Sequence, residues 1–458
     1  MRNIESPIAC VQHAIIQSKL KQANTLSFFN QLTDYDIFDV LEAHLPEHRE
    51  RLFPPTETLS MFLNQALSKD SSCQKAVNDS AVMRMNQQLP LCSTTTGAYC
   101  KARKRLPTQL IQQLTQHTGQ LLHQHTDATW RWKGRHIKLV DGTTVTMPDT
   151  LDNQNTYPQQ GAQKPGLGFP ICRIVGISCL ASGALLNANI GRFNGKGGSE
   201  QNILREMLNS LNKKDLLIGD AFNGTYSLLC ALQHQGVDFL FEKMGQRKRC
   251  TDFSEGKPLG SRDHIQTINK PKVRPNWMDE KTFSELPEFI CVRELKVDDK
   301  VLITSLACPK QHSKDELKQL YRQRWNIELD IRDIKTTMGM EKLTCKTPEM
   351  NEKEMWVYFL AYNLIRLAMT RSAEKVNLKP RDVSFKHSLQ ICLSGISLQT
   401  SEASSLLTLI SQNTVGKRPG RVEPRAVKGR PKPLPLLTKP RHEARREILE
   451  KGHPKKLK

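Results

Sequence analysis

The stretch HIKLVDGTTV, residues 136–145, decides the fold class. It is a short apolar run, enriched in β-branched residues and broken at an Asp-Gly step, and this pattern is typical of a β-strand. Strands of an α/β sheet present their functional side chains where they end. We therefore predict a strand with Asp141 at its end.

A second run of the same kind precedes another acid. In residues 215–222, DLLIGDAF, four apolar or small residues precede Asp220, which we place at the tip of a second strand. The elements between and after the two acids are, in order, a hairpin over residues 172–190, a helix over 199–208, a helix over 225–235 and a strand over 237–241. This order predicts an α/β fold built on a mixed sheet.

A helix downstream carries a third acid. Residues 321–335, YRQRWNIELDIRDIK, place four polar side chains within an arc of roughly 60° if every residue turns by about 100°. This stripe consists of Tyr321, Arg324, Glu328 and Lys335. Isoleucines on an adjacent arc predict that the helix docks on the sheet. Taken alone, Arg324 and Glu328 are better explained by a plain one-turn ion pair on a surface helix, which is commoner than an active site.

Asp141, Asp220 and Glu328 together have the chemistry of a metal site. A carboxylate near the buried side of a helix is costly unless it is paired or binds a metal. Carboxylate oxygens suit Mg²⁺ or Mn²⁺, and two such ions roughly 3.5–4 Å apart can activate an attacking oxygen and stabilise a leaving one. We therefore predict two-metal phosphoryl transfer, with Arg324 and Lys335 placed to hold a DNA phosphate. Tyr321 either donates its hydroxyl to a phosphate or packs its ring.

The spacing Tyr-x₂-Arg-x₃-Glu-x₆-Lys over residues 321–335 resembles the signature of the insertion sequence 4 family of DDE transposases. Asp141 in Val-Asp-Gly-Thr-Thr and Asp220 in Ile-Gly-Asp-Ala-Phe match the settings of the first two acids of that family. The resemblance implies an RNase H-like catalytic domain in which Asp141, Asp220 and Glu328 are the catalytic and metal-binding residues. Such an enzyme cuts both DNA strands at transposon ends and joins the 3′ hydroxyls to a target.

The resemblance also has implications beyond the three acids. It implies double-stranded DNA partners, namely terminal inverted repeats and target DNA, a hairpin intermediate, and a homodimer assembled on paired ends in a synaptic complex. It implies a β-rich insertion between Asp220 and Glu328, which residues 246–310 fit, with strands over 289–292 and 301–304. Trp277 in this segment does not match the base-stacking tryptophan of some relatives, so we interpret it as a packing residue.

Three other acids have simpler interpretations. Glu200 follows Gly-Gly-Ser and is interpreted as a residue of the first turn of the next helix, where an acid is favourable. Asp330 and Asp333 lie away from the stripe that carries Glu328. We therefore do not expect these three residues to replace a member of the triad.

The N-terminal region is predicted to be helical and to bind transposon ends. Apolar residues recur there at three- and four-residue steps, and the hydroxyl cluster at residues 93–96 is suited to a helix cap. The short basic helix that follows has the usual shape of a DNA-contacting helix, although an ordinary charged surface helix is equally compatible. Its cationic residues are Lys101, Arg103, Lys104 and Arg105.

The net charge of +21 indicates a polyanionic partner, and nucleic acid is the first candidate. About half of the surplus lies in the Pro-rich residues 416–458, which we expect to be a disordered basic tail. Twelve cysteines without a Cys-x-x-Cys pair argue against a zinc knuckle and against a secreted disulfide framework. Neither a signal peptide nor a membrane span is apparent, so we expect a cytoplasmic, nucleoid-associated protein.

The predicted fold is an RNase H-like α/β sheet interrupted by a β-rich insertion, with an N-terminal helical DNA-binding domain and a C-terminal helical region. Its predicted segments are a DNA-end-binding domain (1–130), the first catalytic part (131–245), the insertion (246–310), the second catalytic part with the Glu328 helix (311–375), the helical region (376–415) and the tail (416–458). Two alternatives stay open, an RNase H-like structure-specific nuclease and a noncatalytic DNA-binding derivative of a transposase.

Overall fold

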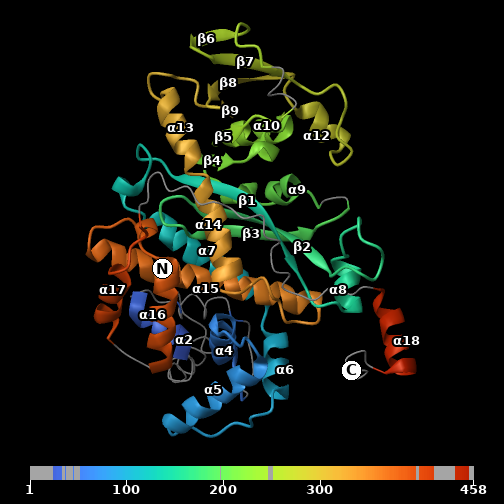
Figure 1. The fold of residues 1–458 in the computed structure, drawn as a ribbon. Helices are drawn as coiled ribbons and strands as arrows, with labels where there is room; N and C mark the ends of the chain where they lie inside the picture. Colours follow the sequence, from blue (N-terminus) through green and yellow to red (C-terminus); the bar gives the residue numbers. More distant parts are fainter. Residues whose placement is uncertain are drawn as a thin grey trace, which may run out of the picture.

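A nine-stranded mixed sheet runs through the middle of the molecule, in the order β3-β2-β1-β4-β5-β9-β8-β7-β6. It is seen in a computed structural model that describes residues 24–33, 37, 45, 52–195, 198–245, 251–398, 402–416 and 439–452. Helices cover both faces of the sheet, and further helices gather below it in Figure 1. The predicted mixed α/β class is confirmed.

One half of the sheet contains the predicted strands and the hairpin. It consists of β1 (Ile137–Thr146), β2 (Ile171–Cys179), β3 (Leu185–Arg192), β4 (Leu216–Gly219) and β5 (Asp238–Glu242). β2 is antiparallel to both β1 and β3, whereas β4 is parallel to β1 and β5. The β2–β3 turn uses Gly183 at a φ of +76°, a conformation that glycine adopts without strain.

The prediction that the first strand ends at Asp141 is wrong. β1 continues to Thr146, because its antiparallel pairing with β2 extends through Asp141, opposite Gly176, and on to the end of the strand. Only the parallel pairing with β4 stops earlier, at Leu139. The Asp-Gly step therefore lies inside a strand, at the point where β4 has ended.

The segment predicted to be an insertion adds four antiparallel strands to the same sheet. These are β6 (Lys257–Gly260), β7 (Asp263–Asn269), β8 (Phe289–Val297) and β9 (Lys300–Thr304), with the short helix α12 (Glu280–Glu285) between β7 and β8. β9 pairs with β5, so these strands lengthen the central sheet at the top of Figure 1. The two strands predicted in this segment are confirmed, and both are longer than predicted.

Each face of the sheet has its own apolar core. On one face, Val140, Val175 and Leu217 pack against α9 (Glu200–Arg205) and α10 (Tyr226–Gln235). On the other face, Leu139 and Ile218 pack against α13 (Lys314–Arg322) and α14 (Trp325–Arg332). Because side chains alternate along a strand, Asp141 shares the face of Leu139, and Gly142 shares the face of Val140.

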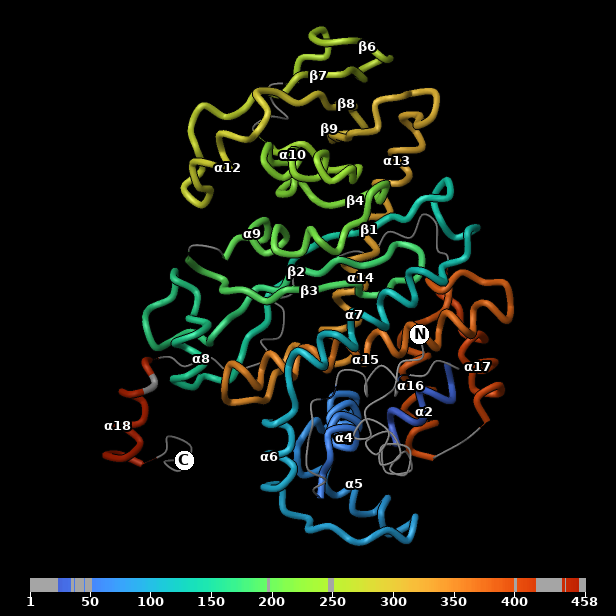
Figure 2. The backbone as a smooth tube through the Cα atoms, turned by 180° about the vertical axis from the view of Figure 1, so that it is seen from behind, coloured from blue at the N-terminus to red at the C-terminus, as the bar shows by residue number. Residues whose placement is uncertain are grey.

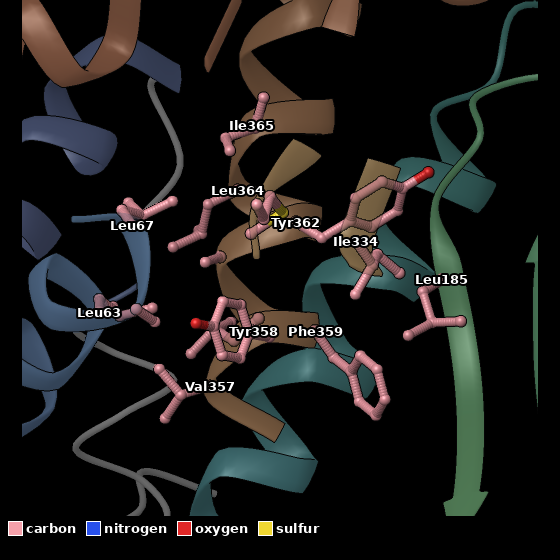
Figure 3. Close-up of a cluster of buried hydrophobic side chains, with 14 of the residues drawn as sticks. Leu63, Leu67, Leu185, Ile334, Val357, Tyr358, Phe359, Tyr362, Leu364 and Ile365 are labelled. Carbon is pink, nitrogen blue, oxygen red and sulfur yellow. The ribbon is translucent and has the colours of Figure 1, made fainter. Parts of the chain in front are cut away.

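The long helix α15 (Pro348–Lys375) is the centre of the largest core. It lies between the sheet and the N-terminal and C-terminal helices (Figures 1 and 2). Figure 3 shows Leu63 and Leu67 on one side of this helix and Leu185 on the other, with Tyr358 and Leu364 among the labelled side chains of α15. A helix apolar on nearly every side needs such partners all round.

The helices around α15 come from both ends of the chain. They are α2 (Asn24–Thr33), α4 (Pro55–Leu67), α5 (Cys73–Asn86), α6 (Gly97–Arg105), α7 (Thr108–Gln124), α16 (Phe385–Leu398) and α17 (Ala403–Ser411). Residues of α2, α4, α7, α16 and α17 share one buried cluster with α15. The predicted N-terminal and C-terminal helices are therefore present, and residues of both groups pack on the same central helix.

One segment of the predicted disordered tail is helical. Residues Arg441–Lys451 form α18, and its Glu447 pairs with Lys439, which precedes the helix. Residues 417–438 and 453–458 lie outside the described part of the chain. Within the described ranges, no helix combines the length and apolar character needed to cross a membrane.

Candidate active site

Asp141 and Asp220 lie side by side because of the register between their strands. Ile137 pairs with Leu216 and Leu139 with Ile218, so the same register brings Asp141 level with Asp220, just beyond the end of β4. Asp220 begins a short 3₁₀ turn, where its Oδ1 accepts hydrogen bonds from the Phe222 N–H and the Asn223 side chain, both at 3.0 Å. One oxygen of Asp220 is thus fixed, and the carboxylate faces the β1 strand.

The third predicted acid, Glu328, lies on α14 and is bound by Arg324. The Arg324 guanidinium donates to Glu328 Oε1 at 2.7 Å and lies 4.0 Å from Asp141 Oδ2. It therefore bridges the helix acid and the strand acid. The one-turn ion pair considered from the sequence is present, and Arg324 links Glu328 to Asp141. Glu328 itself stands outside the group of described acids whose ligand oxygens lie within 4.8 Å of one another.

The prediction of one regular helix through residues 321–335 is wrong. The N–H groups of Gln323 and Arg324 bond to carbonyls three residues back, at 2.9 and 3.0 Å, so a tight turn separates α13 from α14. A turn of this kind advances by about 120° per residue and changes which face a side chain occupies. As a result Tyr321 is buried in the core beside Leu320, and burial raises the pKa of its hydroxyl.

Lys335 occupies a π-helical turn, Asp333–Thr337, that follows α14. Its ammonium donates to Thr143 Oγ1 at 3.1 Å and to the Thr144 carbonyl at 2.8 Å. This cation is therefore bound to β1 two residues beyond Asp141. Single π turns inside helices occur frequently at functional sites.

Glu200 is the acid that the sequence interpretation missed. It is the first residue of α9, as predicted, but its carboxylate also lies beside two of the predicted site residues, Asp141 and Asp220. Ligand oxygens of Asp141, Glu200 and Asp220 all lie within 4.8 Å of one another. The signal was available in the sequence, since a glycine inside a strand often marks a close approach by another group. Gly142 is that glycine, in contact with Glu200.

The three clustered acids are partly withdrawn from water. Burial raises the pKa of Asp141 to about 6, although the Gly142 N–H and Arg324 oppose the shift. Burial also raises the pKa of Asp220 and of Glu200, and for Glu200 the nearby charge of Asp220 adds to the effect. Like charges that are held together in this way indicate a site for a cation with hard oxygen ligands.

The predicted basic helix is present as α6, but its residues have different environments. Lys101, Lys104 and Arg105 are exposed, whereas Arg103 is buried with a guanidinium 3.2 Å from Gln65 Oε1 and 4.7 Å from the centre of the Phe62 ring. The prediction that Arg103 contacts DNA is therefore withdrawn. Its packing explains why a basic residue stands on the inner face of this helix. The expected side-chain cap at residues 93–96 is also missing, because the N-cap Thr96 makes no such bond.

Two other residues considered from the sequence, Asp330 and Trp277, contact arginine side chains of the protein itself. Asp330 is buried and accepts from Arg366, Arg381 and Ser178, which ties α14 to α15 and β2. Trp277 is half exposed and stacks on the Arg205 guanidinium at 3.5 Å from the ring centre. Asp330 thus supports the position of the Glu328 helix without facing the acidic site.

Comparison with known proteins identifies the family. The family model of the transposase DDE domain matches residues 132–364, just over half of the 458-residue chain. The chain is also similar to the transposase InsG for insertion sequence element IS4 of Escherichia coli (strain K12), with 28% identity over 410 residues, which cover 85% of this chain and 89% of that protein.

Among solved structures, the chain is similar to a piggyBac transposase in a synaptic complex with hairpin DNA. The TM-score is 0.43, the sequence identity is 10%, and the match covers 87% of each chain. The matched family segment contains Asp141, Asp220 and Glu328, and it confirms the family predicted from the Tyr-Arg-Glu-Lys spacing. The chain therefore belongs to the DDE transposases, metal-dependent polynucleotidyl transferases that catalyse DNA transposition.

Proposed function

We propose that Asp141, Asp220 and Glu328 hold two Mg²⁺ or Mn²⁺ ions and form the active site for cut-and-paste transposition. The observation that carries this proposal is the juxtaposition of the two strand acids, with Glu328 facing them through the Arg324 guanidinium. The β3-β2-β1-β4-β5 half of the sheet is, in this proposal, the RNase H-like core, and β6 to β9 are the insertion within it.

The residues present fit a divalent metal. Gly142 has no side chain, and a Cβ atom at this position would lie 2.5 Å from the Glu200 carboxyl carbon. The Glu200 carboxylate therefore comes close to β1 beside Asp141. The donors are carboxylate oxygens, which Mg²⁺ and Mn²⁺ prefer. When bound, the two ions supply activation of the attacking oxygen and stabilisation of the leaving oxygen.

The cations around the acids position the DNA. Arg324 neutralises Asp141 and Glu328 in the metal-free protein. With a metal bound, the Arg324 guanidinium would be free to bind a DNA phosphate through two N–H groups. Lys335 anchors β1 next to Asp141 and adds a positive charge beside the phosphate path.

DNA ends are bound outside the acidic site in this proposal. The exposed Lys101, Lys104 and Arg105 of α6 contact the phosphates of terminal inverted repeats, and the basic segment 416–458 adds sequence-independent affinity. A homodimer assembles on paired ends, so that each active site meets one end. The proposed segments remain the DNA-end-binding residues 1–130, the catalytic parts 131–245 and 311–375, the insertion 246–310, the helical region 376–415 and the tail 416–458.

A strand-joining assay tests the proposed chemistry. Purified protein, Mg²⁺ and a labelled fragment that carries the element's own terminal repeat with a free 3′ hydroxyl are mixed with supercoiled plasmid. We expect covalent transfer of the label to the plasmid. Cleavage of the terminal repeat without joining would instead support a structure-specific nuclease. Binding without either reaction would support a noncatalytic derivative.

A further inference from the structure

We propose that Glu200 is a fourth carboxylate of the active site and binds a metal ion together with Asp141 and Asp220. This inference rests on the proposed function and adds a residue outside the Asp141–Asp220–Glu328 triad. Its basis is the cluster in which ligand oxygens of the three residues lie within 4.8 Å of one another. That cluster spans three elements, since Asp141 is on β1, Asp220 follows β4 and Glu200 begins α9.

Gly142 permits the approach of Glu200. Glu200 comes from the face of the sheet that α9 covers, and it passes over the one position of β1 beside Asp141 that has no side chain. A Cβ atom on Gly142 would lie 2.5 Å from Cδ, 2.7 Å from Oε1 and 2.8 Å from Cγ of Glu200. Any other residue at position 142 would therefore push the carboxylate away from Asp141.

The Glu200 carboxylate has no hydrogen-bond donor among the residues that the structure describes. Its nearest cation is Arg173, whose Nε lies 3.8 Å away, while that guanidinium donates to the Gly198 carbonyl at 2.9 Å. Asp141 and Asp220, in contrast, accept from backbone N–H groups. A partly buried carboxylate beside two others is stabilised when a shared cation supplies the missing charge.

An ordinary explanation of Glu200 is a helix-terminal acid, and the chain contains a matched control for it. α9 and α12 are both six-residue helices, each begins with a glutamate, and each is preceded by a capping side chain, Ser199 or Asp279. Glu280 of α12 is exposed and lies outside the acidic cluster. A role confined to the first turn of a helix would make Glu200→Gln and Glu280→Gln equivalent.

Mn²⁺ binding to the full-length protein tests the assignment. Free Mn²⁺ is measured by electron paramagnetic resonance in titrations of the parent and of three variants, Glu200→Gln, Glu280→Gln and Asp141→Asn. We expect Glu200→Gln to weaken the tightest site by at least the roughly 10- to 100-fold that the loss of an outer-shell partner costs. Glu280→Gln is expected to bind like the parent, and Asp141→Asn to lose this site.

The variants separate the two proposals. Parent-like Mn²⁺ binding by Glu200→Gln, with loss of binding in Asp141→Asn, would overturn the role of Glu200 and leave the triad intact. Parent-like binding by both variants would overturn the proposed metal site as well. Thermal unfolding without metal accompanies each titration, and Glu200→Gln is expected to melt at or above the parent temperature because one of three like charges is gone.

A second variant keeps the test valid if Glu200→Gln folds poorly. Gly142→Ala leaves every acid in place and displaces only the Glu200 carboxylate, whose atoms are the three nearest to the added methyl group. We expect Gly142→Ala to weaken Mn²⁺ binding in the parent and to have no further effect in a Glu200→Ala background. Equal weakening in the two backgrounds would contradict the contact on which the assignment rests.

Discussion

At the scale of single residues, the proposed active site combines acids that repel one another with an arginine that bridges two of them. Asp141 is the central member, because it contacts the Arg324 bridge on one face of β1 and precedes Gly142, over which Glu200 approaches from the other. Partial burial makes the charged form of Asp141 costly in the metal-free protein. The site is therefore poised to gain stability when a cation enters.

The raised pKa of Asp141 predicts a pH-dependent stability of the metal-free protein. Its pKa is about 6 in the folded chain against an ordinary value of 3.8. The folded state binds the Asp141 proton more tightly than the unfolded state does. The stabilisation that this proton gives to the folded state is therefore fully present below pH 3.8 and is lost as the pH rises through about 6. Asp141→Asn does not titrate and should stabilise the metal-free protein at pH 8 by on the order of 1–3 kcal/mol, but not at pH 4.

Urea unfolding in the presence of EDTA checks this prediction. Asp299→Asn is the matched control, since Asp299 is exposed in the turn between β8 and β9 and stands outside the acidic cluster. The control should unfold like the parent at both pH values. A stabilisation by Asp141→Asn that is equal at pH 4 and pH 8 would contradict the assignment of the shift to this carboxyl group.

At the scale of elements, the strands and their acids could be predicted from the sequence, whereas the exact course of the chain around them could not. The apolar runs before Asp141 and Asp220 predicted β1 and β4 because strand periodicity is a local property. The continuation of β1 past Asp141 depends on pairing with β2, which local sequence does not encode. The 3₁₀ turn at Arg324 and the cluster around Glu200 arise from tertiary packing in the same way.

The same distinction applies to α6. The helix itself was predictable from the sequence, whereas the side chains that face inward were not. Charge alone suggested that four cations face DNA, yet packing against Gln65 and Phe62 turns Arg103 inward. A combined Lys101→Ala, Lys104→Ala and Arg105→Ala variant should weaken binding to the terminal repeat. The slope of log K against log salt should become shallower by about one for each phosphate that the variant no longer binds.

Arg103→Ala is the contrasting variant for this helix. It removes the interactions of a buried guanidinium with Gln65 and with the Phe62 and Tyr99 rings, so we expect a decrease of about 2–4 kcal/mol in unfolding free energy. The salt slope of DNA binding should stay unchanged at a temperature where the variant is folded. A shallower slope for Arg103→Ala would contradict its removal from the DNA-binding surface.

The Asp330 network gives a further prediction about how α14 is held. Asp330 is almost fully buried and accepts from two arginines, Arg366 of α15 and Arg381. Asp330→Asn leaves these guanidinium groups without their shared countercharge and should cost about 3–5 kcal/mol in unfolding free energy. Chemical denaturation measures that decrease. A change below about 1 kcal/mol would show that the network does not fix this helix.

At the scale of the whole molecule, helices from both ends of the chain share one core with the catalytic sheet. Phe359 of α15 is buried in this core, which includes residues of α4 and of β3. Phe359→Ala should cost about 3–5 kcal/mol through the cavity that it leaves. We expect helix content and tryptophan fluorescence to change in one transition with urea. Separate transitions would instead show that the N-terminal helices unfold independently of the sheet.

The proposed active site is only one part of this assembly, and its three acids lie on β1, directly after β4 and on α14, in distant parts of the sequence. The most direct test of the central claim is excision from a donor plasmid in Mg²⁺ by full-length Asp141→Asn, Asp220→Asn and Glu328→Gln variants, with Asp299→Asn as the control. We predict that the control excises like the parent and that the rate of each triad variant falls at least about a thousandfold. Parent-like excision by any folded triad variant would contradict the assignment of that residue to catalysis.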